Sequence, residues 1–313
     1  MRVLIIGNPI AGVGRAGRRV GELGRLLQDR GCEVTTRLTR GSGDARAFAE
    51  SVGGDVDCLV IAGGDGTIHE AVNGLADPSG TPIAILGVGT ANLLARDLDL
   101  PRTPHGVADL IQHGRTRMLD LGLIGGERRF FAVASAGLDA MVIRALHGTR
   151  RGALGFGGYP LPILKAISRY RPPRLRVSVE GGRPVEGAWV VVANTFTYAG
   201  FLSVADRARC DSGRLDVVVF PRGSLPALAR YAWAGWRRRV SKLTGVSYLT
   251  GVSVRIDSSD PVDVEVDGEY YGVTPIDIAL QTAAAPVLTL VSPGSTARPG
   301  SLGGAFDRAR DTQ

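Results

Sequence analysis

A five-residue glycine loop, Gly63-Gly64-Asp65-Gly66-Thr67, is the feature of this sequence best suited to chemistry. It follows the apolar stretch Leu59–Ala62 and precedes a segment with helical periodicity. Glycines at such a place let backbone N–H groups approach phosphate oxygens, and the helix N-terminus adds positive potential. Asp65 would repel phosphate unless Mg²⁺ lies between them or unless it accepts the proton of the phosphorylated group. We predict a phosphate-handling loop, with Asp65 as a helix cap in a tight turn as the structural alternative.

Three more loops are expected close to this one. Residues 7–15 follow the apolar stretch Val3–Ile6, residues 39–41 follow a second predicted strand, and Gly87–Asn92 follow Ile83–Leu86. In an open parallel sheet, the loops at the carboxyl ends of neighbouring strands converge on one crevice. The four loops are therefore expected to line a single nucleotide site.

Two acidic residues, Asp267 and Glu269, form a second candidate for chemistry. They flank Gly268 at the end of a stretch in which valines alternate with acidic residues, from Val262 to Val266. Asp-Gly is a strong hairpin signal, so the residues alone favour a turn between two strands. A carboxylate that accepts a proton in a reaction is the alternative.

Two kinds of secondary structure are expected to position these residues. As far as residue 120, apolar strands alternate with amphipathic helices, the pattern of a parallel sheet covered on both faces. The expected strands are Val3–Ile6, Cys32–Leu38, Cys58–Ala62 and Ile83–Leu86, and the expected helices are Arg15–Arg30, Asp44–Ser51, one that opens near Thr67, Asn92–Leu98 and Gly106–His113.

After Asp120 the pattern changes to β-branched strands separated by turn-rich loops, which predicts an antiparallel sheet or sandwich. The expected strands are Phe130–Ala134, Leu175–Glu180, Ala188–Ala193, Leu215–Phe220, Ser253–Asp257 and Val262–Val266, with helices over Met141–Leu146, Pro162–Tyr170 and Leu225–Leu243. We therefore predict a nucleotide-binding α/β domain over residues 1–122, a β-rich substrate domain over 123–292 and a partly disordered tail over 293–313.

Composition narrows the class of protein. The 313 residues carry a net charge of +7, which favours phosphorylated ligands, nucleic acid or an anionic membrane face. With 44 glycines, one match to the dinucleotide pattern GxGxxG is expected by chance, so the match at residues 12–17 does not predict a nicotinamide site. Three scattered cysteines fit a reducing compartment, and no apolar stretch approaches the roughly 20 residues of a membrane span. We expect a cytoplasmic protein that is soluble or at most peripheral at the inner face of the membrane.

The motifs together resemble the diacylglycerol kinase catalytic family, soluble bacterial lipid kinases that are related to sphingosine kinases. The resemblance runs from Val3 to about Pro293. It is carried by Asn8-Pro9 with Gly12, Gly63–Glu70, Gly89-Thr90-Ala91-Asn92, Leu119–Gly122, Ala136–Ala140, Asn194 with Gly200, Asp211–Asp216 and Asp267-Gly268-Glu269.

The resemblance implies an ATP- and Mg²⁺-dependent kinase with an NAD-kinase-like first domain and a lipid substrate in the cleft facing the β-rich domain. The residues expected to bind the nucleotide, with Asn8 and Glu70 in support, are Thr39, Gly63, Gly64, Asp65, Gly66, Thr67, His69, Thr90 and Asn92. It also implies that Asp267 or Glu269 accepts the proton of the lipid hydroxyl, with Asp65 as the rival base.

Two departures from the family pattern concern charge. Family members often have an Asp-Asp-Gly or Asn-Asp-Gly turn that helps to hold a structural Mg²⁺, whereas this chain has Asp211-Ser212-Gly213. Serine is a poor Mg²⁺ ligand, so the predicted metal ligands are reduced to Asp211 and Asp216. In addition, Ile10-Ala11 stands where members often have Lys and Ser, a charge that arginines at 15, 18 or 19 would supply.

The segment Leu225–Leu243 is basic and rich in aromatic residues. Leu225, Leu228, Ala232, Trp236 and Val240 fall on one helical stripe, and Tyr231 and Trp233 lie nearby. Such a helix is typical of a membrane-surface contact, and a helix packed on the sheet with a solvated face is the alternative. Because no recognition motif accompanies the basic residues, we do not predict nucleic-acid binding. Homodimerisation through the sheet domain is compatible with the sequence.

Three functions are compatible with these observations. The first is a lipid kinase that phosphorylates a hydroxyl of diacylglycerol or a related lipid. The second is an NAD kinase, since that family shares the GGDGT loop, although His69-Glu70 and Gly89–Asn92 favour the lipid kinase. The third is a catalytically silent lipid- or nucleotide-binding protein, which only Ser212 supports.

Overall fold

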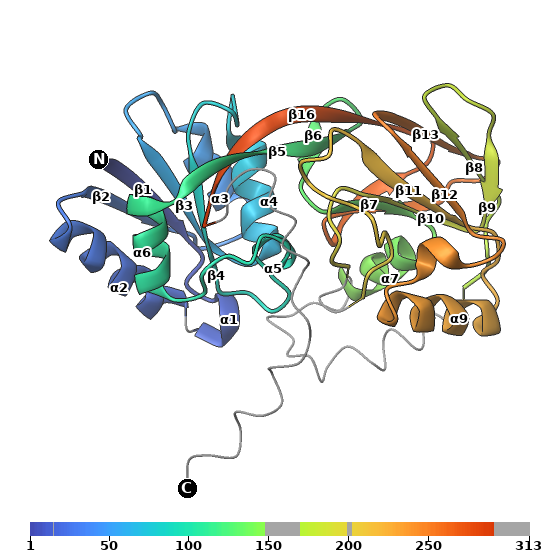
Figure 1. Cartoon of the computed structure of the whole chain (residues 1–313), viewed down its shortest axis with the longest axis horizontal. Coiled ribbons are helices and arrows are strands. Elements are labelled where there is room, and N and C mark those ends of the chain that lie inside the picture. Colours follow the sequence, from blue (N-terminus) through green and yellow to red (C-terminus); the bar gives the residue numbers. More distant parts are fainter. Residues whose placement is uncertain (15, 148–169, 199–201, 291–313) are drawn as a thin grey trace, which may run out of the picture.

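The computed structural model describes residues 1–14, 16–147, 170–198 and 202–290 (Figure 1). Four features named above fall wholly or largely outside these residues: Arg15, the helix expected over Pro162–Tyr170, Gly200 and the tail over 293–313. Two lobes lie side by side, an α/β lobe at the N-terminus and a β-rich lobe after it.

The first lobe is built on four parallel strands in the order β2 (Glu33–Leu38), β1 (Arg2–Gly7), β3 (Cys58–Gly63) and β4 (Ile83–Gly87). Every residue of β3 and β4 is buried, because these strands lie in the middle of the sheet with helices on both faces. The prediction of a parallel α/β domain is confirmed.

Six helices lie around this sheet in the described part of the lobe, and five of them match the predicted helices, whereas α1 was not predicted. They are α1 (Ala11–Gly14), α2 (Ala16–Asp29), α3 (Asp44–Glu50), α4 (Asp65–Gly74), α5 (Leu93–Asp97) and α6 (Pro104–His113). Helix α2 buries Val20, Leu23 and Leu27 on one stripe. At the start of α6, the Thr103 side chain accepts a hydrogen bond from Gly106 N at 3.2 Å, and Pro104 occupies the first turn.

Two long antiparallel strands join the lobes, β5 (Arg115–Ile124) and β16 (Ile276–Thr289). Their pairing runs from Ile278↔Ile124 to Thr289↔Arg115, and β16 also pairs in parallel with β4 at Val287↔Ile83. Figure 1 shows both strands crossing from one lobe to the other. The sequence reading did not include β16, because its alanine-rich middle lacks β-branched residues. The domain boundary after residue 122 stays a prediction, but the last described strand completes the sheet of the first lobe.

The second lobe is a sandwich, which confirms the antiparallel prediction. One layer continues the large sheet from β16 through β13 (Ser253–Ser258), β8 (Leu175–Val179) and β9 (Val185–Gly187). The other layer is a six-stranded sheet, β12-β11-β10-β7-β14-β15, and β6 (Arg128–Phe130) pairs with β5. The six strands are β12 (Ser247–Gly251), β11 (Leu215–Phe220), β10 (Trp189–Ala193), β7 (Val133–Ala136), β14 (Asp263–Val266) and β15 (Glu269–Val273). Valine and isoleucine side chains from both layers form the core between them.

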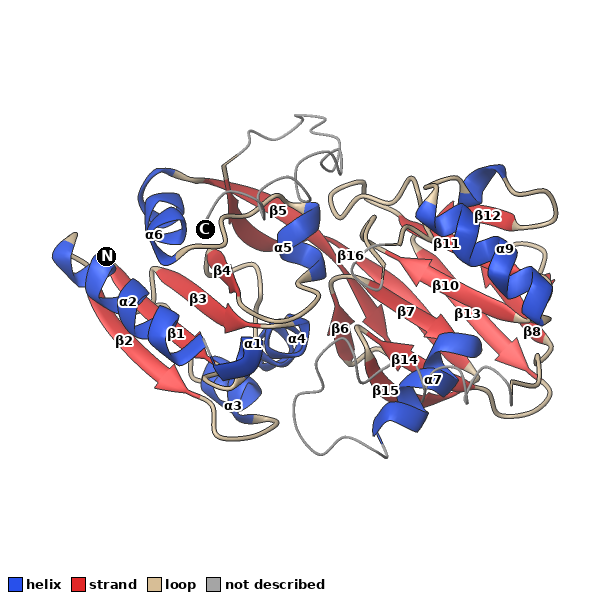
Figure 2. Cartoon of the chain, turned by 90° about the horizontal axis from the view of Figure 1, so that it is seen from below, coloured by secondary structure: helices blue, strands red, loops and turns tan. Residues whose placement is uncertain are grey.

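Two helices cover the outer face of the six-stranded sheet, α7 (Leu138–His147) and α9 (Leu225–Trp236), as seen from below in Figure 2. The expected helix over Leu225–Leu243 is wrong in its extent. Arg238 adopts a left-handed φ of 52°, which ends α9, and a separate 3₁₀ turn follows over Val240–Lys242.

Candidate active site

The four predicted loops meet at the carboxyl ends of the parallel strands. Asn8 N donates to Ala62 O at 2.9 Å, and Thr39 N donates to Gly7 O at 2.8 Å. The loop after β4 joins the loop after β3, because Val88 N donates to Gly63 O at 3.0 Å. The predicted convergence of the loops is confirmed.

Glycine is required where two of these loops touch. A Cβ added to Gly89 would lie 2.4 Å from Gly64 Cα, and a Cβ added to Gly63 would lie 2.4 Å from the Thr67 side chain. The backbones of the two loops are therefore in direct contact. The N-terminal turn of α4 lies where these two loops meet. The first amides of a helix have no carbonyl partner one turn back.

The remaining side chains of the loops have distinct surroundings. Asn8 Nδ2 donates weakly to the buried Thr67 Oγ1 at 3.4 Å, and Glu70 accepts from Ser42 Oγ at 3.1 Å. Thr39 is buried, and Thr90 is exposed at the end of the β4 loop. Each of these predicted nucleotide-binding residues thus lies in or beside the converging loops.

Asn92 supplies an acceptor suited to a ligand. Its Nδ2 donates to Gly89 O at 2.8 Å, and its backbone is left-handed with a φ of 48°. Its Oδ1 is buried without a hydrogen-bond partner among the described residues. A ribose hydroxyl, an adenine amino group or a cation would satisfy this oxygen, so the site fits a nucleotide.

Asp65 occupies the first turn of α4, but it does not cap that helix. Its Oδ1 accepts from Leu93 N at 2.6 Å, and the N-cap is Gly64, which makes no side-chain cap bond. Burial, reinforced by the nearby Asp267 carboxylate, raises the pKa of Asp65 to about 6, although the Leu93 amide opposes the shift. The helix-cap alternative is therefore wrong, and the carboxylate links the loops that follow β3 and β4.

His69, which was expected beside the nucleotide, is buried between the lobes. Its Nδ1 lies 3.2 Å from Asp267 Oδ2, which accepts the ring N–H, and both side chains are about 5% exposed. Burial lowers the pKa of His69, but the hydrogen bond and charge of Asp267 outweigh it and raise the pKa overall.

Asp267 lies in the hairpin turn between β14 and β15, so the predicted turn is confirmed. Its φ is 49°, and its carboxylate is surrounded by donors. Oδ1 accepts from Ala132 N at 2.9 Å and Val133 N at 3.0 Å, and Oδ2 accepts from Phe131 N at 3.0 Å and from His69. A carboxylate that is held by three amides and a histidine has little capacity left for a substrate proton.

Glu269, two residues further on, is in a different position. A Cβ added to Gly66 would lie 3.5 Å from Glu269 Oε1, so the carboxylate faces the glycine loop. It is half-buried and makes no hydrogen bond to the part of the chain that the structure describes. Asp65, His69, Phe131 and Asp267 line a small cavity between the lobes nearby.

The sequence reading missed Glu265 and Asp139. Alternation with valines alone would place Glu265 on the solvent side of its strand, but α7 covers this face and Glu265 is 3% exposed. Its Oε1 accepts from Ser135 Oγ at 3.2 Å, and its Oε2 accepts from Gly268 N at 2.7 Å. Burial and the Asp139 carboxylate raise the pKa of Glu265, while Trp189 Nε1 donates to Asp139 Oδ1 at 3.0 Å.

The predicted metal ligands have other partners. Asp211 Oδ2 accepts from Arg117 Nη2 at 2.5 Å and Nε at 3.0 Å, and Arg209 Nε lies 3.3 Å from Oδ1. Asp216 is buried on β11, where burial raises its pKa and a hydrogen bond with Tyr248 opposes the shift. Within the described ranges no group of three or more His, Cys, Asp or Glu side chains is arranged to hold a metal. Because two guanidinium groups face Asp211, this turn does not fit a structural Mg²⁺.

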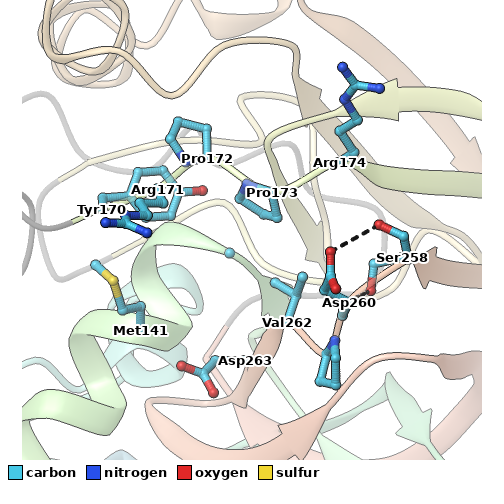
Figure 3. A pocket seen from close by; sticks show the side chains of 13 residues that line it. Met141, Tyr170, Arg171, Pro172, Pro173, Arg174, Ser258, Asp260, Val262 and Asp263 are labelled. Atoms are coloured by element: carbon cyan, nitrogen blue, oxygen red, sulfur yellow. Dashed lines mark hydrogen bonds between the residues drawn. The ribbon is translucent and has the colours of Figure 1, made fainter.

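A larger cavity of about 360 Å³ lies elsewhere in the second lobe (Figure 3). Tyr170, Pro172 and Pro173 line one side, and the segment from Ser258 to Asp263 lines another. It opens at the Gly137–Asp263 end of the β7–β14 pair, whereas Asp267 lies at the opposite end of that pair. The cavity is therefore separate from the carboxylates beside the glycine loop.

Comparison with known proteins identifies the family. Residues 2–124 match the diacylglycerol kinase catalytic domain, and residues 132–291 match the YegS C-terminal NAD kinase beta sandwich-like domain. The chain belongs to the diacylglycerol kinase family. The resemblance to this family that the sequence motifs indicated is thus confirmed.

Relatives of this family member cover nearly all of it. A diacylglycerol kinase of Bacillus subtilis (strain 168) is 28% identical over 279 residues, covering 88% of this chain and 91% of that protein. A crystal structure of a diacylglycerol kinase from Bacillus anthracis str. Sterne has a TM-score of 0.71 at 21% identity, covering 93% and 97%. An NAD kinase from Archaeoglobus fulgidus in complex with ATP has a TM-score of 0.51 at 12% identity, covering 94% of each chain. At these identities the two structures bear on the fold alone.

Proposed function

We propose that this protein is an ATP-dependent lipid kinase that transfers the γ-phosphoryl group of ATP to a hydroxyl of diacylglycerol or a related lipid. The observation that carries the proposal is the Glu269 carboxylate, which faces the glycine loop at Gly66 and lacks a hydrogen bond to the described residues. A proton acceptor next to a phosphate-binding loop is what hydroxyl phosphorylation requires. Family membership supports kinase chemistry, and the ATP complex of the similarly folded NAD kinase supports the choice of nucleotide.

In the proposed reaction, Glu269 accepts the proton of the lipid hydroxyl as the oxygen forms its bond to the γ-phosphorus. The bond from that phosphorus to the bridging oxygen breaks, and ADP leaves. The amides of the loop Gly63–Thr67 and the N-terminus of α4 stabilise the phosphate charge. Mg²⁺ bound to the ATP phosphates would neutralise further charge, with Asp65 as its nearest carboxylate on the loop. Asp267 orients His69 and the turn that carries Glu269.

The test combines an assay with matched variants. The purified protein is incubated with γ-labelled ATP, Mg²⁺ and vesicles that contain diacylglycerol, and the organic phase is chromatographed. We expect labelled lipid from the unmodified chain, none from Asp65→Ala, and a kcat about 10²- to 10⁴-fold lower for Glu269→Gln. The control Glu186→Gln, an exposed carboxylate on β9, is expected to leave kcat unchanged.

Two results would contradict the proposal. Protein that binds ATP but labels no lipid would favour a silent binding protein. Label transferred to NAD in a parallel incubation would favour an NAD kinase.

A further inference from the structure

Helix α9 packs on the six-stranded sheet with one face. Tyr231, Ala234 and Gly235 are buried against the sheet and its loops. The Tyr231 ring lies 4.6 Å from the Phe220 ring, centroid to centroid, and Phe220 stacks on Trp189 at 4.3 Å. This face accounts for the attachment of α9 to the protein.

The opposite face of α9 is also apolar, although it is exposed. Leu225 is 60% exposed, Trp233 61% and Trp236 55%, and the two tryptophan rings lie 5.0 Å apart. Ala229 and Ala232 are exposed between them. We call these five residues the α9 outer face. Helix α9 is thus apolar on both faces, and the described part of the fold covers only one of them. An exposed apolar patch of this kind marks an interaction site.

The charged residues of the segment that carries the α9 outer face are all positive. From Val217 to Ile256 the sequence contains seven arginines and lysines and no aspartate or glutamate. Six of these cations have exposed side chains, and the five that lie outside β13 are Arg222, Arg230, Arg237, Arg239 and Lys242. A nearby carboxylate, Asp206, is engaged by Ser241 Oγ at 2.9 Å. The surface is therefore complementary to a dense array of negative charge.

We propose that the α9 outer face docks on an anionic lipid membrane. Exposed tryptophans insert favourably at the boundary between headgroups and acyl chains, and arginines flanking them pair with lipid phosphates. In Figure 1 α9 lies along the lower edge of the molecule, and Figure 2 views this side directly. Among the described residues no helix is long and apolar enough to cross a bilayer. The inference deepens the proposed function, because it places the protein on the surface that holds its lipid substrate.

Flotation with vesicles of phosphatidylglycerol or of phosphatidylcholine tests the contact without any enzyme assay. We expect the full chain to bind phosphatidylglycerol vesicles and to bind phosphatidylcholine far more weakly. Arg237→Gln/Arg239→Gln should weaken partitioning about 30-fold, since each cation near an anionic surface contributes about fivefold. Trp233→Ser/Trp236→Ser should weaken it at least about tenfold.

Matched controls separate these effects from general changes in charge and polarity. Arg25→Gln/Arg46→Gln removes two exposed cations from α2 and α3, and Met118→Ser/Val252→Ser removes two exposed apolar side chains. Both controls are expected to bind vesicles like the unmodified chain. Brominated phosphatidylglycerol should quench the tryptophan fluorescence of the unmodified chain, because only Trp189 of its three tryptophans is buried.

Several outcomes would overturn the proposal. One is equal vesicle binding by the α9 variants and the controls, and another is binding without fluorescence quenching. A dimer that only the tryptophan variant dissociates would show that a second copy covers α9, and α9-dependent binding of a DNA oligonucleotide in place of vesicles would assign the surface to nucleic acid. Kinase assays with a soluble short-chain diacylglycerol distinguish failure of the membrane proposal from failure of the proposed kinase function. The α9 variants should keep full activity on this soluble substrate and lose activity only on diacylglycerol in vesicles.

Discussion

Asp65 and Asp267 face the same small cavity, but different groups hold them. Asp267 accepts hydrogen bonds from three backbone amides and His69, whereas one amide, that of Leu93, donates to Asp65 at 2.6 Å. Burial together with the Asp267 charge favours the protonated form of Asp65. Glu269 is the third carboxylate, and it faces the loop without such partners.

Replacing Asp65 by asparagine is expected to change how stability depends on pH. Because the folded-state pKa is about 6 and the ordinary value is 3.8, the folded chain binds this proton more tightly than the unfolded chain does. The free energy of unfolding therefore falls as pH rises from about 4 to 6, by up to about 3 kcal/mol, and Asp65→Asn should abolish that part of the slope. Urea denaturation of both proteins at three pH values across this window measures it. Parallel curves for the two proteins would contradict the prediction.

Glu265 is expected to act as a positioning residue for the turn that carries Glu269. Its Oε2 accepts from Gly268 N at 2.7 Å, and burial favours its neutral form. Glu265→Gln keeps a neutral acceptor and should retain most activity, whereas Glu265→Ala leaves the amide unsatisfied and should cost about 1–3 kcal/mol of stability.

The readout for Glu265 is the split between kcat and KM for ATP, together with thermal unfolding. We expect Glu265→Ala to lower kcat while KM for ATP changes little, because the turn lies across the cavity from the nucleotide loops. Equal loss of activity in the Gln and Ala variants would indicate instead that the carboxyl proton itself is needed.

Among the elements, β5 and the turn over residues 210–213 depend on each other. Arg117 on β5 pairs with Asp211, and Asp120, three residues on, accepts from Gly213 N at 2.7 Å. The Arg117 hydrogen bond and charge outweigh burial, so the pKa of Asp211 lies below its ordinary value. A guanidinium group thus supplies the positive charge at this turn.

Arg117→Gln should therefore lower the free energy of unfolding by about 2 kcal/mol, because it leaves a partly buried carboxylate with one exposed arginine partner. Arg209→Gln, the matched control, should cost less than about 0.5 kcal/mol, because Arg209 is 45% exposed. The double variant Arg117→Gln/Asp211→Asn should lose less than the sum of its single changes. Thermal unfolding of each variant measures these changes in stability. The same measurement with and without Mg²⁺ tests the metal site, and a rise in Tm of the unmodified chain on addition of Mg²⁺ would contradict the conclusion that this turn does not fit Mg²⁺.

For the whole molecule, the two lobes are expected to fold as one unit. Strand β16 pairs with β5 along both lobes and with β4 in the first lobe, and Leu93 of the first lobe packs in the core beneath α9. A fragment of residues 1–124 lacks β16 and exposes the edge of β4, so it should be largely unfolded. Calorimetry should show a single transition for the full chain, and circular dichroism should show little helix for the fragment. A fragment that folds and binds ATP would contradict this expectation.

Much of the first lobe could be predicted from local sequence. Fully apolar strands such as Cys58–Gly63 are buried on both faces, so their composition alone indicates a central parallel sheet. The convergence of the loops follows from that topology, and Asp-Gly at 267–268 specifies its hairpin through backbone conformation. In each case the determining interactions lie within a few residues along the chain.

Only the tertiary structure decided the features that depend on distant residues. His69 finds Asp267, 198 positions away, and Glu265 is buried because α7 covers a strand face that alternation alone would assign to solvent. The expected stripe on α9 was divided, with Leu228 against the protein and Leu225 and Trp236 exposed, because the sheet selects which apolar face it covers. Side-chain periodicity shows that a face is apolar, but packing between segments far apart in sequence determines what lies against it.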